Sequence, residues 1–235
     1  MTKISIVVPV FNESPNIQQL IDSITLQSLQ PYEVILVDGG STDDTVEKIR
    51  NITLPKLQLK LLIKKGAMPG QGRNVGTEAA AGEWIAYTDA GIKLDSDWLL
   101  ELNKVREGES EVDIIYGNVI PIVRNFFEKA ACISYTPSSK KDMITMKFIA
   151  SCMIKKQLWK EVGGFPDYRA AEDLIFMEKA EIISKCIGFA PKAIVHWELR
   201  KELASTFKKF YLYSAYNVWA AKQADWHYGI ARQYL

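Results

Sequence analysis

The first hundred or so residues alternate short apolar runs with amphipathic segments, and few folds accommodate that pattern. The apolar runs are rich in β-branched side chains, which is typical of buried strands, and the segments between them carry apolar residues at helical spacing. Repeated strand–helix–strand units of this kind predict a parallel, doubly wound sheet. The predicted strands cover residues 4–8, 34–37, 57–63 and 84–87.

Helix-start signals follow the first two strands. Ser14 and Pro15 stand where an N-cap and a first-turn proline are expected. Ser41, with Asp44 three residues later, resembles a capping box that opens the second helix. Because Ser41 can serve as the cap, we interpret Asp38 as available for a ligand.

Polar side chains follow three of the predicted strands. Asn12 and Glu13 come after the first strand, Asp38 after the second and Asp89 after the fourth. Ligands of doubly wound sheets bind beyond the carboxyl ends of the strands, where the strand order reverses. The sequence therefore predicts a binding site at this edge of the sheet.

The second half of the chain is less regular. Strands are predicted over residues 112–119, 148–154 and 193–197, with helices over 173–183 and 203–222. No stretch has the composition of a linker, so we expect a single domain over residues 1–235.

Composition and charge exclude several classes of protein. The 29 basic and 28 acidic residues give a net charge of +1, which argues against a nucleic-acid partner. The three cysteines form no C-x-x-C pair, which favours a reduced, cytoplasmic protein. Neither a signal peptide nor a run of ~18 apolar residues is evident, so we expect no membrane-spanning segment.

Five sequence blocks carry the chemistry. They are VPVFNE at 8–13, VDGGSTDDT at 37–45, GQGRNVG at 70–76, YTDAG at 87–91, and GGFP at 163–166 leading to AEDL at 171–174. The third block is spaced G-x-G-x-x-x-G and does not follow the first strand, so it is not a dinucleotide fingerprint. An arginine at a glycine-rich helix start, as at Arg73, suits a planar base or a phosphate.

In this order, the five blocks resemble a family 2 glycosyltransferase over about residues 3–200. The resemblance implies an α/β fold of the GT-A type: a mostly parallel doubly wound sheet of Rossmann-like βαβ units with a mixed acceptor-side half. The nucleotide-binding half would cover about 1–92, the acceptor and catalytic half about 93–200, and an aromatic helical segment about 201–235. The implied activity is the inverting transfer of a sugar from a nucleotide-diphosphate sugar, with a UDP-sugar favoured, to a hydroxyl of a saccharide or lipid-linked acceptor.

The resemblance also assigns roles on the nucleotide side. Pro9, Phe11 and Glu13 match the segment that borders the base and the ribose. Asp38 matches the aspartate that hydrogen-bonds the base. Arg73 matches an arginine beside the base and the diphosphate.

On the reacting side, Asp89, followed by Ala90, matches the first aspartate of the family's D-x-D motif, which contacts the ribose and helps to place a divalent metal. Asp173 matches the general base and Glu172 the acid beside it. These roles are physically coherent, because the leaving diphosphate needs a cation or oriented donors and the acceptor hydroxyl must lose a proton. Gly91, however, stands where the family usually has a second aspartate.

The departure at Gly91 leaves Asp89 as the best protein ligand for Mg²⁺ or Mn²⁺. We interpret Asp95 and Asp97 as caps of the following helix rather than as replacements. His196 matches a histidine that touches metal or diphosphate in the family, and the alternative is a histidine satisfied within the core.

Three alternatives stay open at this point. Glu172 and Asp173 could act only as caps of their helix. The chain could bind a nucleotide-sugar without turning it over, because Gly91 replaces the second aspartate of the D-x-D motif. The segment 203–226 could lay an apolar stripe on the core (Leu203, Phe207, Phe210, Tyr211, Ser214 and Val218), or bring its remaining aromatic and lysine side chains to a membrane surface. A nucleotidyltransferase is disfavoured, because no glycine-rich phosphate loop follows the first strand.

Overall fold

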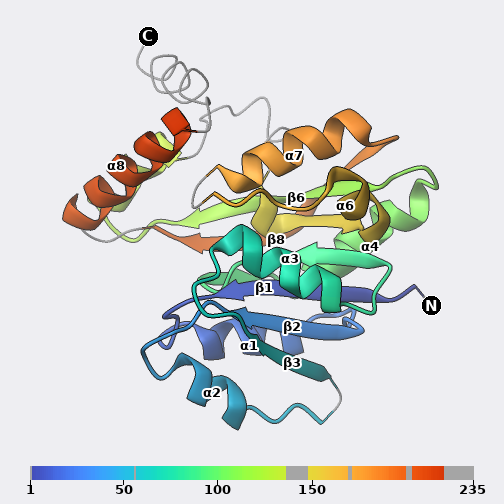
Figure 1. Ribbon diagram of the computed structural model, residues 1–235, viewed down its shortest axis with the longest axis horizontal. Coiled ribbons are helices and arrows are strands. Elements are labelled where there is room, and N and C mark those ends of the chain that lie inside the picture. Colours follow the sequence, from blue (N-terminus) through green and yellow to red (C-terminus); the bar gives the residue numbers. More distant parts are fainter. Residues whose placement is uncertain (1, 56, 136–147, 169–170, 200–202, 220–235) are drawn as a thin grey trace.

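A computed structural model describes residues 2–55, 57–135, 148–168, 171–199 and 203–219 (Figure 1). In these residues a single sheet has the order β3-β2-β1-β4-β7-β6-β8-β5. Its strands are β1 Ile4–Val10, β2 Glu33–Asp38, β3 Gln58–Ile63, β4 Trp84–Tyr87, β5 Ile92–Leu94, β6 Ile114–Ile122, β7 Cys152–Lys155 and β8 Ile187–Glu198. The helices are α1 Ile17–Thr25, α2 Thr45–Asn51, α3 Pro69–Ala79, α4 Trp98–Gly108, α5 Phe126–Tyr135, α6 Lys156–Val162, α7 Glu172–Ile183 and α8 Leu203–Trp219, and a short 3₁₀ turn covers Ile149–Ser151.

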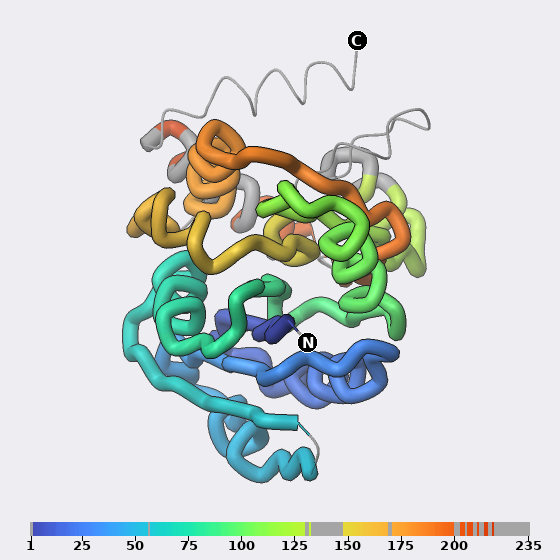
Figure 2. The backbone as a smooth tube through the Cα atoms, turned by 90° about the vertical axis from the view of Figure 1, so that its right-hand side faces the viewer, coloured from blue at the N-terminus to red at the C-terminus, as the bar shows by residue number. Residues whose placement is uncertain are grey.

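The sheet has a parallel half and a mixed half. β3, β2, β1 and β4 run parallel, which confirms the prediction from the alternating pattern. β7 is antiparallel to both β4 and β6, whereas β6 and β8 are parallel and β5 is antiparallel to β8. In Figure 2 the parallel half, coloured blue to teal, forms the lower part of the molecule, with α6 and α7 in the upper part.

Each face of the sheet is covered by its own apolar cluster. Alternate residues of β1 point to opposite faces, as the period of a strand requires. On one face Ile6 and Val8 pack in a cluster with side chains of α1 and α4. On the other face Val7 packs in a cluster with side chains of α6 and α7. The predicted doubly wound architecture is therefore confirmed.

Two predicted helix starts were wrong by several residues. α1 begins at Ile17 rather than after Ser14, because the carbonyl of Glu13 first closes a turn by accepting the N–H groups of Asn16 and Ile17. α2 begins at Thr45, and Ser41 does not cap it. The Ser41 hydroxyl instead donates to the carboxylate of Asp38.

The start of α4 is as predicted, but the capping chemistry is not. Asp97 occupies the N-cap position without a side-chain hydrogen bond to the helix. Its carboxylate accepts the hydroxyl of Ser28, which lies in the connection between α1 and β2.

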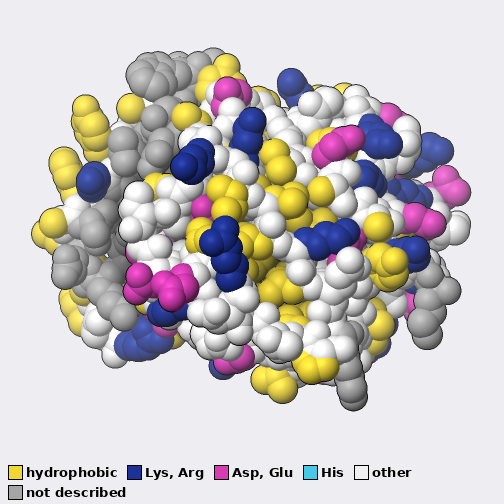
Figure 3. All heavy atoms as spheres, turned by 60° about the horizontal axis from the view of Figure 1, so that its bottom comes forward, with side chains coloured by type: hydrophobic (Ala, Val, Ile, Leu, Met, Phe, Trp, Pro, Cys, Tyr) yellow, Lys and Arg dark blue, Asp and Glu magenta, His cyan; other side chains and the backbone are white. Residues whose placement is uncertain are grey.

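The α8 helix lies at one end of the molecule (Figure 1). Four residues of its predicted core-facing stripe are more than half exposed, so the interpretation that this stripe packs on the core is wrong for them: Leu203, Phe207, Tyr211 and Val218. Apolar side chains protrude at the same end in Figure 3. Lys201, Lys222 and Trp226 lie outside the described residues, and no helix within the described ranges is long and apolar enough to cross a bilayer.

Candidate functional site

The predicted site lies where the strand order reverses. β1 sits between β2 and β4, so the chain leaves the carboxyl ends of β1 and β4 in different directions. A doubly wound sheet opens a crevice at such a point. Glu13 follows β1 and Asp89 follows β4, as the sequence predicts.

The loops after β1 and β2 are tied together by hydrogen bonds between side chains and backbone. Asn12, which has a positive φ of 54°, accepts the N–H of Thr42 at 2.8 Å and donates its own N–H to the hydroxyl of Ser41 at 2.8 Å. The N–H of Glu13 donates to the hydroxyl of Thr45 at 2.9 Å. These bonds fix the backbone that carries Glu13.

Asp38 is fully buried and is engaged by its own loop. Its carboxylate accepts the N–H of Gly40 at 2.8 Å and the N–H of Ser41 at 2.9 Å, in addition to the Ser41 hydroxyl. The premise that Ser41 caps α2 and so leaves Asp38 available for a ligand was therefore wrong, because Ser41 bonds Asp38 instead. Its carboxylate shapes the loop beside the predicted base pocket, and its contact with a base stays a prediction.

Phe11 and Pro9 line the same edge. The Phe11 ring is 54% exposed and lies beside Gly39, whose backbone would bring a Cβ within 3.5 Å of the ring. An exposed aromatic face at a sheet edge suits stacking on a flat base. Pro9 lies under α3, where a Cβ on Gly72 would approach the proline Cβ to 3.1 Å.

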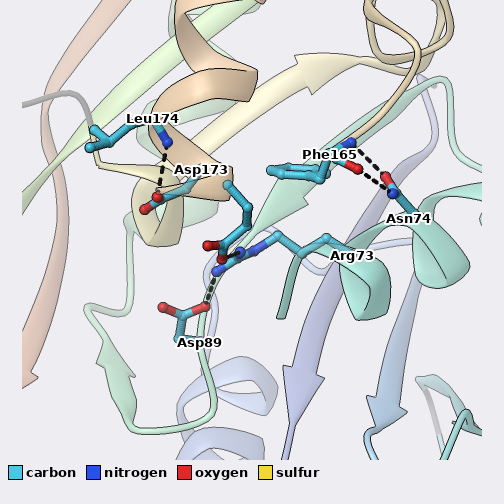
Figure 4. A network of polar contacts seen from close by, with 7 residues as sticks. Arg73, Asn74, Asp89, Phe165, Asp173 and Leu174 are labelled. Carbon is cyan, nitrogen blue, oxygen red and sulfur yellow. Dashed lines mark hydrogen bonds and ion pairs between the residues drawn. The ribbon is translucent and has the colours of Figure 1, made fainter. Parts of the chain in front are cut away.

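Arg73 links the two halves of the site (Figure 4). Its Nη2 lies 2.7 Å from Asp89 Oδ1, and its Nη1 lies 3.2 Å from Glu172 Oε1. The side chain of Arg73 is only 4% exposed, so both ion pairs are shielded from water on the arginine side. Residues separated by about a hundred positions in the sequence thus meet at one guanidinium, and the predicted place of Arg73 beside a base and a diphosphate stays a prediction.

The glycines of α3 explain how Arg73 reaches this position. A Cβ on Gly76 would lie 2.4 Å from a methyl of Val7, and a Cβ on Gly70 would lie 2.8 Å from Cγ of Glu172. Only glycine permits such close approach of the helix to β1 on one side and to α7 on the other. The glycines of this block are therefore required for the close packing of α3.

Burial and charge shift the pKa values of the three central groups. Burial alone would lower the pKa of Arg73, but the charges of Asp89 and Glu172 outweigh it and raise this pKa. Burial, together with the charge of Asp173, raises the pKa of Glu172 to about 7 against the opposing charge of Arg73. Burial also raises the pKa of Asp173, again opposed by Arg73. A carboxylate with a raised pKa is a better proton acceptor at neutral pH.

Asp173 lies in the first turn of α7 and is partly exposed. Its Oδ1 accepts the N–H of Leu174 at 2.9 Å, so a local, cap-like contact exists. Glu172, in contrast, is buried against Arg73 and does not cap the helix. The N-cap position is taken by Ala171 in the left-handed region, with a φ of 66°. The capping alternative therefore applies in part to Asp173, whereas the carboxylate of Glu172 is also paired with Arg73.

The residues that could hold a metal are few. Among the described residues no three His, Cys, Asp or Glu side chains are grouped to hold an ion. His196 lies opposite Lys93 in the β5–β8 ladder, with its Nε2 3.9 Å from Asp95 Oδ2. Thus Asp95 is the acidic group beside His196, and protein ligands alone do not build the predicted Asp89–His196 centre.

The carboxylate of Glu13 lies next to Gly91. A Cβ on Gly91 would lie 3.9 Å from Glu13 Oε2, which also accepts the side-chain amide of Asn16 at 2.7 Å. Ala90, between Asp89 and Gly91, is buried. Mg²⁺ and similar ions are commonly held by one or two carboxylates together with substrate phosphates. Asp89 with Glu13 fits that donor set, whereas a closed protein cage does not.

Sequence reasoning missed two contributors to the site. Asn74 and Phe165 were quoted within the third and fifth blocks but received no role, and they form a contact between α3 and the loop before α7 (Figure 4). Their positions inside the same blocks as Arg73 and Glu172 are the signal that could have pointed to them.

A comparison with known families decides the assignment. The family described as Glycosyl transferase family 2 matches residues 5–160, which include the strand ends that carry Glu13, Asp38 and Asp89. The chain belongs to glycosyl transferase family 2. The resemblance drawn from the five sequence blocks is thereby confirmed.

Curated relatives within this family share part of the chain. Glycosyltransferase AglE of Haloferax volcanii is 29% identical over 172 residues, covering 70% of this chain and 56% of the relative. A PGL/p-HBAD biosynthesis glycosyltransferase of Mycobacterium bovis is 34% identical over 125 residues, covering 52% of this chain and 48% of the relative. The chain thus spans about half the length of these relatives.

Solved structures confirm the GT-A fold of this family 2 chain. S. aureus TarS 1-349 in complex with UDP-GlcNAc superposes with a TM-score of 0.66 at 25% identity, covering 86% of this chain and 60% of TarS. The mannosyltransferase PcManGT from Pyrobaculum calidifontis, in complex with GDP-Man and Mn²⁺, gives a TM-score of 0.69 at 24% identity, covering 88% of this chain and 59% of that one. The second likeness concerns the fold alone.

Proposed function

We propose that this chain transfers a sugar from a nucleoside-diphosphate sugar to an acceptor hydroxyl, with inversion at the anomeric carbon. The observation that carries the proposal is the buried guanidinium of Arg73, which holds Asp89 of the nucleotide side and Glu172 of the catalytic side together. A UDP-sugar is the favoured donor, because TarS, at 25% identity, was solved with UDP-GlcNAc.

In the proposed reaction Asp173 acts as the general base. Its carboxylate takes the proton of the acceptor hydroxyl while the hydroxyl oxygen bonds to the anomeric carbon. The bond from that carbon to the diphosphate oxygen breaks, and its electron pair leaves with the nucleoside diphosphate. Burial raises the pKa of Asp173, which strengthens it as a base.

Glu172 and Arg73 support this step without forming a bond to the sugar. Glu172 is buried and paired with Arg73, so its charge is directed at the arginine rather than at an acceptor. We therefore assign Glu172 to the catalytic pair as the residue that orients the first turn of α7. Arg73 places a fixed positive charge beside the strand end where the diphosphate is expected.

A divalent cation, Mg²⁺ or Mn²⁺, fits the nucleotide side of the proposed site. It would neutralise charge on the leaving diphosphate. Asp89 would hold it, with Glu13 at the position that Gly91 leaves open. His196 would contribute only through the diphosphate or a water, because the acidic group beside it is Asp95.

Nucleotide-sugar turnover tests the proposal. Hydrolysis of UDP-GlcNAc and GDP-mannose is measured with Mn²⁺ for the wild type and for Asp173→Asn. We expect slow donor hydrolysis that falls by about 10²- to 10⁴-fold in the variant, as is usual when a general base is lost. Asp22→Asn, at an exposed position on α1, is the matched control. Equal rates for the wild type and Asp173→Asn would contradict the assignment of the base.

A binding protein without catalysis is the second candidate, and Gly91 is the observation that favours it. Calorimetry with UDP and with UDP-GlcNAc separates the two. Donor binding without turnover across saccharide acceptors would support the binding protein. Turnover that depends on Asp173 would exclude it.

The exposed stripe of α8 supports a peripheral contact with a membrane, which would suit a lipid-linked acceptor. Leu203, Phe207 and Tyr211 are exposed at helical spacing, and Lys208 is exposed beside them. Such a face can lie in the interface of an anionic bilayer. In a flotation assay the wild type should rise with anionic vesicles, whereas Phe207→Glu should stay in the unbound fraction. A position at the cytoplasmic face of a membrane stays a prediction.

A further inference from the structure

The side chain of Asn74 pairs with the backbone of a single distant residue. Its Nδ2 donates to the carbonyl of Phe165 at 2.8 Å, and its Oδ1 accepts the N–H of Phe165 at 2.8 Å. The same Oδ1 accepts the indole N–H of Trp159 at 3.0 Å. One amide therefore satisfies both backbone groups of Phe165, as a neighbouring strand would (Figure 4).

The loop is shaped to bring Phe165 to this amide. Gly163 ends α6 in the left-handed region, and Gly164 continues with a second positive φ of 79°. A Cβ on Gly164 would lie 2.7 Å from Asn74 Oδ1, closer than real Cβ contacts come. The GG dipeptide thus serves two purposes: it supplies the backbone angles and it leaves space for the amide.

Phe165 in turn contacts three elements of the site. Its ring stacks on Phe176 of α7 with centroids 3.9 Å apart and meets the edge of Tyr87 of β4 at 5.4 Å. The guanidinium carbon of Arg73 lies 5.5 Å from the ring centroid. Because Phe165 is fully enclosed, a shift of its backbone would be transmitted to α7 and to Arg73.

We propose that Asn74 is a positioning residue that sets the distance between Arg73 and the first turn of α7, and so places Asp173 against the acceptor. The proposal rests on the proposed transferase function for its catalytic consequence. Asn74 touches neither donor nor acceptor in this role. It acts through Phe165, whose backbone it holds and whose ring packs on α7.

Asn74→Leu removes all three hydrogen bonds and keeps a similar volume. A displacement near 1 Å can cost about 10²-fold in rate, so we expect kcat for UDP-GlcNAc hydrolysis to fall by about 10- to 100-fold. KM for the donor should change less than about threefold, because the hydrogen bonds that tie the loops after β1 and β2 do not involve Asn74. Asn74→Asp should also lower kcat, because a carboxylate cannot donate a hydrogen bond to the Phe165 carbonyl.

A mutant cycle separates the hydrogen bonds from general packing. Trp159→Phe removes the indole N–H bond and part of a buried apolar ring, and we expect a two- to fivefold loss of kcat in the wild type. In an Asn74→Leu background the loss should be smaller, because the acceptor is already absent and only the packing change remains. Asn103→Leu on α4, where Asn103 also accepts and donates side-chain bonds, is the matched control.

Hydrogen exchange gives a readout that does not depend on turnover. In Asn74→Leu, amides of 165 and 171–177 should exchange at least tenfold faster, while those of 5–10 should not change. Unchanged exchange, unchanged kcat, or a joint loss of kcat and UDP affinity would overturn the inference. Faster exchange in the variant, with a wild type that turns over no donor, would contradict the proposed function while retaining the placement of α7 by Asn74.

Discussion

The two sides of the site are held in place by different means. On the nucleotide side, the loops after β1 and β2 are neighbours and are tied directly through Asn12, Ser41 and Thr45. On the catalytic side, the first turn of α7 depends on a different element, α3, which supplies Arg73 and Asn74. The comparison indicates that the proposed nucleotide pocket is shaped by two neighbouring loops, whereas the placement of the proposed base, Asp173, depends on elements far apart in the sequence.

The largest expected effect comes from Arg73→Met, which breaks the link between the two sides. Asp89 and Glu172 would lose their shared cation, and breaking a buried pair typically costs about 3–5 kcal/mol. We expect a loss of this size in urea unfolding at pH 8. Arg124→Met is the control, because the Arg124–Glu198 pair is partly exposed to solvent, and it should cost much less than Arg73→Met. Equal costs would mean that the central pair contributes no more than a surface pair.

A second prediction concerns Glu172 and pH. Burial, with the charge of Asp173, raises the pKa of Glu172 to about 7. The folded state therefore holds this proton more tightly than the unfolded state, and the associated stability is complete below pH ~4.5 and is lost as pH rises through 7. Glu172→Gln mimics the protonated form, so its stability relative to wild type should rise by about 2–3 kcal/mol between pH 4 and pH 8.

Urea unfolding of both proteins across this pH range checks the second prediction. Glu161→Gln, on the surface of α6, controls for the change in net charge. Parallel curves for wild type and Glu172→Gln would show that the environment of Glu172 does not favour its protonated form. Such a result would mean that ionisation of Glu172 does not destabilise the folded protein.

The third prediction sharpens the metal assignment on the nucleotide side. Glu13→Gln should weaken Mn²⁺ binding to the UDP complex by about tenfold, or ~1.4 kcal/mol. Gly91→Asp should restore it, because a Cβ at Gly91 meets only Glu13 Oε2, at 3.9 Å. Electron paramagnetic resonance of Mn²⁺ reports this binding without turnover. Asp97→Asn is the control. If Gly91→Asp did not recover Mn²⁺ binding in the Glu13→Gln background, Glu13 would not be the replacement carboxylate.

The smallest effect should come from Ser41→Ala, which loosens the two tied loops. The hydroxyl bonds Asp38 and accepts the N–H of Asn12, and a hydrogen bond contributes about 1 kcal/mol net. We expect UDP affinity to fall by up to about fivefold, measured by calorimetry, with kcat unchanged. Ser28→Ala, whose hydroxyl bonds Asp97 away from the site, is the control. A loss of kcat would show that the nucleotide side also positions the base.

Local patterns in the sequence predicted the parallel half of the sheet and the acidic residues at its strand ends. Alternation and helical spacing report which face of an element is buried, so β1, β2, β3 and β4 were found close to their bounds. The division of residues 1–235 into functional parts stays a prediction.

Only the tertiary structure showed that Ser41 bonds Asp38 rather than capping α2, that four residues of the apolar stripe of α8 are exposed, and that Asn74 holds Phe165. Each of these depends on where two segments lie relative to each other in space. A hydrogen-bonding side chain has several possible partners within its own segment and many outside it, and its choice is made by the packing of the whole sheet and its helices. The sequence by itself determined which strands of the parallel half form and which acidic residues lie at their carboxyl ends. The meeting of Asp89 and Glu172 at one guanidinium was decided by the close packing that the glycines of α3 allow.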